Sequence, residues 1–366
     1  MLAETTYIEF GPTQLNDLLL QTSGVDRDTT LSTINTAADV ELDACGRLVS
    51  NGFLLTPLAF SQLCQCVARG LGTLVSDIGG IYRSRRAYDS AISIPLAVRI
   101  LNDCVRLRLH AIDGLSGRSM IQNHRTRTVD GIVGPNYQLL PNCQFIDALG
   151  DMLATYDIPM DFHEATLDGR RLSMLYLSGD TINPGDRYAA NCGMYFSNSE
   201  VGETSVRGAV VIQYARTLRL MNKTHSISHT GTDFAKRLNK MLKTIAADWS
   251  PTVRVAERLQ SKFHIPVSFV SEDGKLNTLE RDRLEVQLTK HVDTKLAQQL
   301  VRRIVYKGSR DGELPRRVVS EEIASRRLYD IVHVVSTAAK GNQQLLREKL
   351  ERAAFELLTQ DTYSRR

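Results

Sequence analysis

The sequence has no long hydrophobic run and no paired cysteine motif. No stretch of 18 or more apolar residues occurs in the chain, so we expect no membrane-spanning helix. The first residues, MLAETTYIEFG, contain neither a basic leader nor an apolar core, and they predict no secretory signal. The six cysteines include no C-x-x-C pair and lie at positions 45, 64, 66, 104, 143 and 192. These absences favour a cytoplasmic protein with reduced thiols.

Short catalytic signatures are also missing. The sequence has no G-x-x-x-x-G-K-[ST] phosphate loop, no G-x-S-x-G nucleophile turn and no H-E-x-x-H metal motif. We therefore predict a protein that is not an enzyme and uses no cofactor or metal. Two alternatives stay open. His225 and His229 have the spacing of two metal ligands, and His229 with Asp233, or with a carboxylate near residue 180, has the side chains of a hydrolase.

Charge is distributed unevenly over a chain of ordinary globular composition, which is 42% hydrophobic and 23% charged with a net charge of +4. Residues 1–80 carry 3 Lys or Arg against 9 Asp or Glu, residues 81–250 carry 20 against 16, and residues 251–366 carry 22 against 16. With the change in sequence pattern, this predicts an acidic N-terminal segment with one helix (1–80), an α+β core domain (81–250) and a helical C-terminal region (251–366). The basic surplus of the last two parts is compatible with an anionic partner.

Two β-hairpins are predicted in the middle of the chain. In residues 187–223, two runs rich in Tyr, Phe, Val and Ile flank a polar turn, and the second run keeps alternating as far as Met221. Asp168-Gly169 marks the turn of the other hairpin. Helices are expected from Thr56-Pro57, from Asn142 and over residues 232–249, because these segments have an N-cap residue or an apolar stripe of helical period.

The expected fold is α+β. It is a curved antiparallel sheet with long β-hairpins and flanking helices on one side, followed by a helical C-terminal region. Helical periodicity in that region covers residues 252–263, 278–305, 318–338 and 343–359. Residues 1–50 are expected to be irregular or lightly stranded.

Basic residues recur on segments predicted to be loops or strands. Residues 81–89 interleave arginines with tyrosines, and strands with cationic faces are expected at residues 105–112 and 123–128. Proteins that hold single strands bind phosphates and stacked bases with this mixture, although simple solvation of the arginines is the alternative. Tyr82 and Tyr195 are candidates for base stacking. The residues expected to bind nucleic acid are Arg83, Arg85, Arg86, Arg106, Arg108, Arg125, Arg127, Tyr137, Arg170, Arg171, Tyr214, Arg216, Arg219 and Lys223.

The chain also resembles the phage- and plasmid-borne family called domain of unknown function 932. The resemblance lies in four successive blocks: GPNYQLLPNCQFIDAL, DGRRLSMLYLSGD, YAANCGMYFSNSEVGETSVRGAVVIQYARTLRLMNKT and SISHTGTDFAKRLNKML. It covers roughly residues 130–250. One departure is that relatives have a cysteine and paired asparagines near MNKT, where this chain keeps only Asn222. The family's strand order is similar to that of phage single-strand annealing proteins, which hold single-stranded DNA in rings or filaments without ATP.

The expected function is therefore single-stranded DNA binding or annealing in recombination or replication. The resemblance implies a phage or mobile-element protein that forms a homo-oligomer in the cytoplasm of a bacterial host cell. The alternative is an oligomeric structural or interaction protein of a phage, such as a virion or host-takeover component, with no nucleic-acid role. The first function requires that arginines far apart in the sequence form a continuous basic track beside the sheet.

Overall fold

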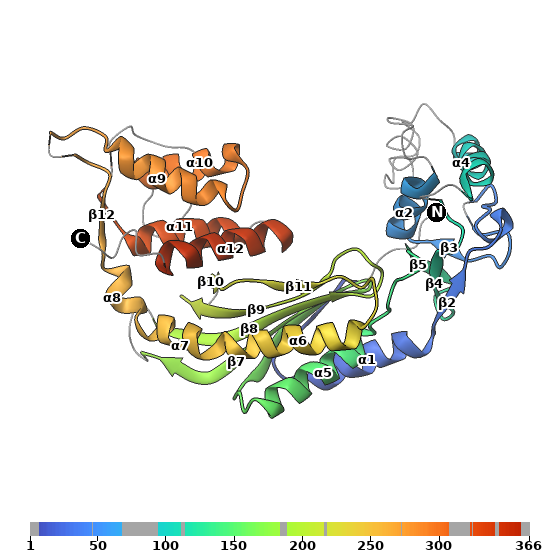
Figure 1. Cartoon of the computed structure of the whole chain (residues 1–366), viewed down its shortest axis with the longest axis horizontal. Coiled ribbons are helices and arrows are strands. Elements are labelled where there is room, and N and C mark those ends of the chain that lie inside the picture. Colours follow the sequence, from blue (N-terminus) through green and yellow to red (C-terminus); the bar gives the residue numbers. More distant parts are fainter. Residues whose placement is uncertain are drawn as a thin grey trace.

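The structure is a computed structural model of the chain, and it describes residues 7–45, 47–67, 94–110, 114–183, 189–215, 218–271, 273–306, 323, 325–340 and 344–359. Within these residues the fold is mixed α+β, with a large antiparallel sheet and a set of C-terminal helices. The predicted fold class is confirmed. Figure 1 shows the sheet between two helical layers, with a smaller N-terminal unit at one end. Among the described residues, no helix is both long and apolar enough to cross a membrane.

The large sheet has seven strands in the spatial order β1-β6-β7-β8-β9-β10, and β11 pairs with the first residues of β9. All neighbouring strands are antiparallel. Their bounds are β1 (Tyr7–Phe10), β6 (Asp161–Asp168), β7 (Arg171–Ile182), β8 (Ala190–Ser199), β9 (Val206–Tyr214), β10 (Leu218–Met221) and β11 (His225–Ile227). The sheet therefore joins the N-terminal strand to strands from the middle of the chain.

The hairpins predicted at Asp168-Gly169 and over residues 187–223 are present. Gly169 joins β6 to β7 with φ +58°, and Gly202 lies in the turn from β8 to β9 with φ +71°. These backbone angles are left-handed, and glycine adopts them without the steric cost that a side chain brings. The glycines in the two turns are thus the local reason why the chain reverses at these points.

The prediction of one continuous strand as far as Met221 is wrong, because the chain reverses after Tyr214. Ala215 has φ +48°, which ends β9, and β10 then runs back along β9 with Leu220 opposite Ile212. Tyr214 and Leu218 are also directly paired, and both are buried. The reversal turns these side chains toward the core instead of extending an alternating surface.

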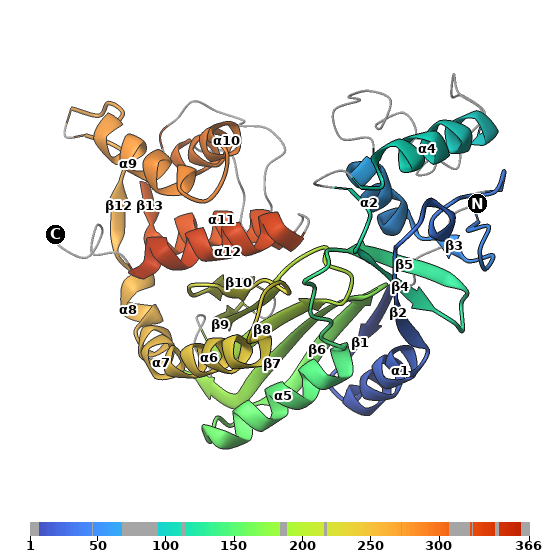
Figure 2. The same ribbon diagram turned by 45° about the vertical axis from the view of Figure 1, so that its right-hand side comes forward.

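One face of the sheet is covered by three helices: α1 (Leu15–Arg27), α5 (Asn142–Thr155) and α6 (Phe234–Ala247). Figure 2 shows α1 and α5 lying beneath the strands. Phe145 of α5 and Ile245 of α6 pack with Phe196 and Val210 of the sheet in one buried cluster. Helices α5 and α6 were predicted, whereas α1 lies in the segment expected to be irregular.

The C-terminal helices pack around the β9–β10 end of the sheet and reach its other face. Contacts of α11 and α12 with β10 close this end, and the buried cluster there includes Tyr214, Leu220 and Phe263. The expected helix at residues 278–305 is two helices separated by residues 290–293. The elements are α7 (Trp249–Glu257), α8 (Leu259–Phe263), β12 (Pro266–Ser268), α9 (Thr278–Thr289), α10 (Thr294–Val305), β13 (Ser325–Arg327), α11 (Leu328–Lys340) and α12 (Gln344–Thr359).

A second sheet with the order β2-β4-β5-β3 forms the N-terminal unit. Phe60 of α2, Leu101 of α4 and Ile132 of β5 belong to its buried cluster. The expected domain boundary at residue 80 falls between α2 and α4, which pack together inside this unit. The elements are β2 (Thr29–Thr33), a short 3-10 helix (Ala37–Asp39), β3 (Leu54–Leu55), α2 (Pro57–Val67), α4 (Ile94–Arg108), β4 (Ser119–Asn123) and β5 (Thr128–Val133).

Two expected basic strands of this unit are wrong. Residues 105–108 continue α4, because Val98, Leu101 and Val105 are buried at helical spacing while Leu107 is 85% exposed. Residues 111–113 lie outside the described residues. Residues 124–127 form the turn between β4 and β5, where Arg127 has φ +54°. The arginines of these segments therefore lie on a helix and a turn.

Gly193→Ala is predicted to destabilise the large sheet. A Cβ atom at this position in β8 would clash with the backbone carbonyl of Tyr176 and with Leu177. We expect a loss of about 1–3 kcal/mol in the free energy of unfolding, measured by urea denaturation. The matched control is Gly150→Ala in α5, where a Cβ would meet nothing within 4 Å, and a gain of roughly 0.5–1 kcal/mol is expected. Equal effects of the two substitutions would contradict this packing.

Candidate functional site

Those predicted nucleic-acid residues that the structure describes do not form one continuous surface. Arg106 and Arg108 belong to α4 of the N-terminal unit, where Arg106 forms ion pairs with Glu41 and Asp103. Lys223 is exposed between β10 and β11. Outside the described residues lie Arg83, Arg85, Arg86, Arg216 and Tyr82.

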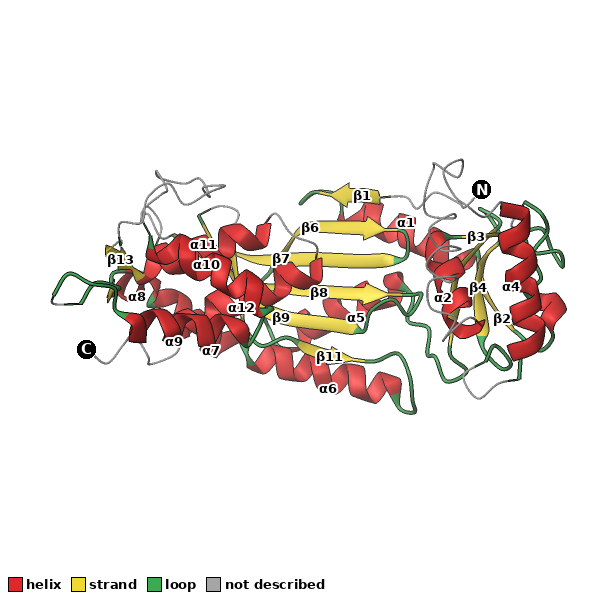
Figure 3. Cartoon of the chain, turned by 90° about the horizontal axis from the view of Figure 1, so that it is seen from above, coloured by secondary structure: helices red, strands yellow, loops and turns green. Residues whose placement is uncertain are grey.

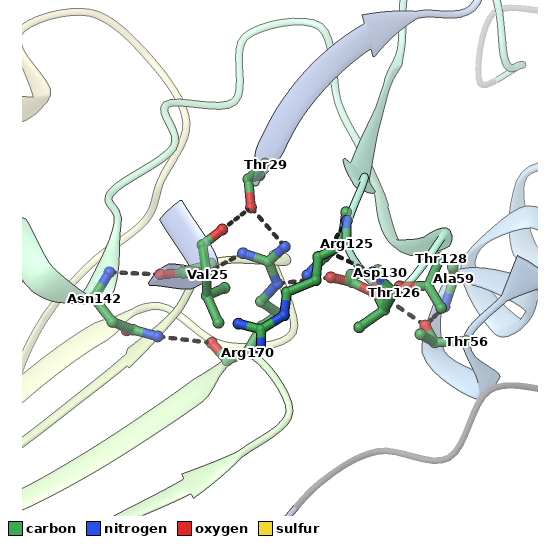
Figure 4. A network of polar contacts seen from close by, with 12 residues as sticks. Val25, Thr29, Thr56, Ala59, Arg125, Thr126, Thr128, Asp130, Asn142 and Arg170 are labelled. Carbon is green, nitrogen blue, oxygen red and sulfur yellow. Dashed lines mark hydrogen bonds and ion pairs between the residues drawn. The ribbon is translucent and has the colours of Figure 1, made fainter. Parts of the chain in front are cut away.

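Arg170 lies at the centre of a buried polar network (Figure 4) and does not face solvent. The side chain is 6% exposed. Its Nε donates to Asp130 Oδ2 at 2.7 Å, its Nη1 to Glu200 Oε2 at 2.8 Å and its Nη2 to Thr29 Oγ1 at 2.7 Å. Asp130 and Thr29 belong to the second sheet, whereas Glu200 follows β8 of the large sheet. Arg170 therefore connects the two sheets and cannot bind a phosphate in this arrangement.

The remaining groups of the network are consistent with this structural role. Burial raises the pKa of Glu200, although Arg170 and the backbone N–H of Asn142 act in the opposite direction. The Asn142 side chain donates to the backbone carbonyl of Arg170 at 3.4 Å. The helix α5, which begins at Asn142, is thus tied to the same junction.

Three other predicted contact residues are also engaged inside the protein. Arg219 is 5% exposed, and its Nε donates to Glu351 Oε1 of α12 at 3.1 Å. Tyr214 is 1% exposed and cannot stack on a base. The Tyr137 hydroxyl donates to the backbone carbonyl of Ser199 at 2.9 Å, and its ring stacks on His229. The prediction that these side chains meet a strand at the surface is therefore wrong for this conformation.

A groove lies on the face of the large sheet opposite α1, α5 and α6, beside the C-terminal helices, and continues to the end of the sheet next to the N-terminal unit. Seen from above, β6, β7 and β8 lie between the C-terminal helices and the N-terminal unit (Figure 3). Two adjoining cavities of about 500 Å³ and 410 Å³ share Asp168, Arg171 and Glu203, and together they are called the sheet groove here. The larger one is bounded by Arg347 of α12, and the smaller one by Pro57 and Thr126 of the N-terminal unit.

Strand pairing explains the side chains of the groove. Tyr7 of β1 lies opposite Asp168 of β6, and Asp168 lies opposite Arg171 of β7, so the three point to the same face. Tyr7 is 60% exposed, which makes it an aromatic surface on the face opposite α1, α5 and α6. Arg171 is half-buried and forms no ion pair among the described residues.

The groove has mixed charge. The larger cavity is lined by three arginines and three carboxylates: Arg171, Arg219, Arg347, Glu164, Asp168 and Glu203. Glu351 of α12 accepts hydrogen bonds from both Arg219 and Arg347, so part of the positive charge of the cavity is neutralised. Arg171 is thus the lining cation that has the most charge available to a ligand.

The β4–β5 turn places two further predicted arginines at the end of the groove. Thr126 of this turn lines the smaller cavity, and the exposed Arg125 and Arg127 flank it. Arg127 Nη2 donates to the backbone carbonyl of Asn51 at 2.8 Å, and its guanidinium lies 5.8 Å from the centre of the Phe53 ring. The turn that carries Arg125 and the strand that carries Arg171 therefore border the same cavity, through Thr126 and Arg171.

The two histidines do not share a metal site. His225 Nε2 lies 2.7 Å from Asp248 Oδ2, and His229 Nδ1 lies 3.1 Å from the backbone carbonyl of Gln138. No group of three or more His, Cys, Asp or Glu in the described part of the chain could hold a metal ion. A carbonyl, and not Asp233, orients the His229 ring, so the arrangement differs from the hydrolase alternative.

No protein-family model, curated protein or solved structure matches the chain. The resemblance of residues 130–250 to the phage family stays a prediction.

Arg170→Ala is predicted to weaken the junction of the two sheets. The substitution leaves Asp130 and Glu200 as neighbouring buried carboxylates without a cation, and we expect a loss of about 3–5 kcal/mol in the free energy of unfolding. Arg171→Ala is the matched control, because the adjacent arginine faces the groove, and a change within about 0.5 kcal/mol is expected. Guanidinium chloride denaturation measures both. An equally small loss of unfolding free energy in both variants would contradict the structural role of Arg170.

Proposed function

We propose that the chain binds single-stranded nucleic acid in the sheet groove and does so without nucleotide hydrolysis. The observation that carries the proposal is the exposed Tyr7 on β1, which lines the larger cavity together with Arg171, two strands away on β7. An exposed aromatic ring on a sheet offers a surface for an unpaired base, and a nearby arginine offers a charge for the adjoining phosphate. The absence of a phosphate-loop motif from the sequence is compatible with binding that needs no ATP.

In this arrangement the strand runs from the β4–β5 turn across β6 and β7 toward α12. Arg125, Arg171 and Arg347 meet phosphates, and Tyr7 stacks on a base. The carboxylates Glu164, Asp168 and Glu203 then face base edges, where they accept hydrogen bonds from amino groups. With about three phosphates neutralised, the logarithm of the binding constant should fall with the logarithm of salt concentration with a slope of about −2.

The biological role follows from the family resemblance and is part of the proposal. A phage or mobile-element protein of this kind would protect or anneal single strands during recombination or replication in the cytoplasm of the host cell. Annealing requires that several protein copies hold one strand, so a homo-oligomer in a ring or filament is included. Each copy holds one segment of the strand in its groove.

A second candidate is supported by the equal number of arginines and carboxylates in the larger cavity. Such mixed charge also suits a protein segment, which would make the chain a structural or interaction protein of a phage. In that case a partner or a second copy occupies the groove, and nucleic acid does not.

Tyr7→Ala and Arg171→Ala are predicted to weaken strand binding in different ways. Loss of the ring should cost about 1–3 kcal/mol of binding free energy and leave the salt slope unchanged, because stacking releases no counterion. Loss of the arginine should weaken binding and also reduce the salt slope by about 0.7. Fluorescence anisotropy with a labelled single-stranded oligonucleotide, titrated at several salt concentrations, measures both quantities.

Lys240→Ala is the control, because Lys240 is exposed on α6, which packs on the opposite face of the sheet. It should leave affinity and slope close to those of the unchanged protein. Binding that is absent at low salt, or that Lys240→Ala weakens as much as Arg171→Ala, would contradict the groove as the site.

Light scattering separates the two candidates. If nucleic acid is the partner, addition of the oligonucleotide should change the oligomeric state, and Arg171→Ala should reduce the change. If a protein segment occupies the groove, the oligomer should be the same with and without oligonucleotide.

A further inference from the structure

The strand β2 forms one edge of the second sheet. It stands at the end of the order β2-β4-β5-β3, and among the described strands it pairs with β4 alone. Its residues, TTLST, run in register with β4 over their whole length. An edge strand has a row of backbone N–H and C=O groups that point away from the sheet, and such a row is a template for a further strand.

Hydrogen bonds at the two ends of β2 show which of its backbone groups face outward. The Asp28 carbonyl accepts from the residue that follows β4 at 2.9 Å, and Ile34 N donates to the residue that precedes β4 at 2.8 Å. Because the direction alternates along an antiparallel strand, the even-numbered residues between these two also face β4. The N–H and C=O groups of Thr29, Leu31 and Thr33 therefore point away from the sheet.

The edge at β2 has little protection against another strand. It contains no charged residue, no proline and no bulge, which are the usual means of keeping an edge strand single. At the other edge of the second sheet, β3 is two residues long, and Arg47 forms a bridge to it. In the large sheet, β1 carries Glu9, and α11 and α12 pack against β10. Each of these edges is short, charged or covered, whereas β2 is none of the three.

The middle of β2 is accessible, and its first residue is fixed in place. Leu31 is 48% exposed, although Ile121, its neighbour on β4, is fully buried. The Thr29 hydroxyl accepts from Arg170 at 2.7 Å and donates to the Val25 carbonyl at 2.6 Å. The edge is thus held in an extended conformation before a partner arrives, which lowers the entropy cost of pairing.

The sequence of β2 is nearly the same in both directions, and this favours a second copy of the strand as its partner. A two-fold antiparallel register centred on Leu31 places that residue opposite its own equivalent in the second copy. Thr29 then lies opposite Thr33, and the two remaining residues lie opposite each other. Leucine meets leucine and hydroxyl meets hydroxyl, so the register brings no charge against an apolar group.

The same register satisfies the outward backbone groups. In an antiparallel ladder, two opposite residues exchange both of their hydrogen bonds only if the backbone groups of each face the other strand. Leu31 with its equivalent, and Thr29 with Thr33, are such pairs. A shift by one residue would place an outward-facing residue opposite an inward-facing one, and a shift by two residues would shorten the ladder. The geometry of β2 therefore selects one register.

We propose that β2 pairs with β2 of a second copy of this chain, so that the second sheets of two molecules join across a two-fold axis. Backbone hydrogen bonds and the contact between the two Leu31 side chains hold this dimer. It forms without nucleic acid and does not rest on strand binding in the sheet groove. Because a two-fold contact closes on itself, a ring or filament would need a second contact.

Sedimentation equilibrium of the full chain, freed from nucleic acid, tests for the dimer. A ladder of five residues is a small contact, so we expect a dissociation constant on the order of micromolar. The average mass should rise from 40.9 kDa toward twice that value between about 1 and 100 µM protein. A mass that stays at one chain over this range overturns the proposal.

Leu31→Lys and Leu31→Glu test the two-fold register. Each variant alone places like charges opposite each other, and its dissociation constant should rise about tenfold or more. An equal mixture of the two variants should dimerise about as well as the unchanged protein, because the charges at this position are then opposite. Unchanged dimerisation of the single variants, or no recovery in the mixture, overturns the proposal.

Val49→Lys is the matched control, because Val49 is 61% exposed in the same N-terminal unit and lies outside β2. It should change the dissociation constant by less than about twofold. Equal weakening by Val49→Lys and Leu31→Lys overturns the proposal. If circular dichroism shows that a Leu31 variant does not fold, Thr33→Pro takes its place, since the N–H group that it removes does not face β4. Unchanged dimerisation of folded Thr33→Pro likewise overturns the proposal.

Discussion

The Arg170 ion-pair network is the interaction on which the arrangement of this protein depends. It brings Asp130 of the second sheet and Glu200 of the large sheet to one buried position, where two carboxylates would repel each other without a cation between them. A guanidinium satisfies both because its donors point in fixed directions within one plane. Lysine could not reproduce this geometry. The two sheets therefore meet in one orientation.

Two cavities at the junction depend on this orientation. The smaller cavity of the sheet groove is lined by Thr126 and Asp130 from one sheet and by Arg171 from the other. A cavity of about 320 Å³ between α2 and the turn after β8 likewise takes Ile132 from one sheet and Thr204 from the other. These two cavities are therefore complete only when both units are in place, whereas the larger cavity of the groove is formed by the large sheet and α12. The buried network is thus a structural requirement for binding although none of its charges needs to touch a ligand.

The hairpins and several helices were predictable because their signals are local. Asp168-Gly169 and Gly202 require left-handed backbone, and Thr56 followed by Pro57 marks the start of α2, where Thr56 Oγ1 accepts from Ala59 N at 3.2 Å. The strand expected at residues 105–112 failed because arginine and leucine alternate over only a few positions. Three buried residues at helical spacing, Val98, Leu101 and Val105, are the longer pattern, and tertiary packing selects it.

The sites were much less predictable, since they are made by contacts between distant segments. Positive charge in the sequence did not indicate which arginines are free: Arg170 and Arg219 are used in internal ion pairs, and Arg171, adjacent to one of them, is available. Tyr7 had no local signal, because only its pairing with Asp168 places it on the face opposite α1, α5 and α6. Arg347 and Glu351 come from a helix near the other end of the chain. The strand order therefore has to be known before the residues that share a site can be identified from the sequence.

The position of β1 has a consequence for how the protein is made. Its partner β6 is synthesised only after the entire N-terminal unit, which lies between the two strands in the sequence. At a translation rate of about 5–20 residues per second, β1 has to wait on the order of 10–30 s for that partner to leave the ribosome. The unit with the second sheet has all its strands available earlier and can fold first, as an insertion does. The N-terminal strand is therefore paired only after the second sheet has been made, and the nascent chain exposes an unpaired edge until then.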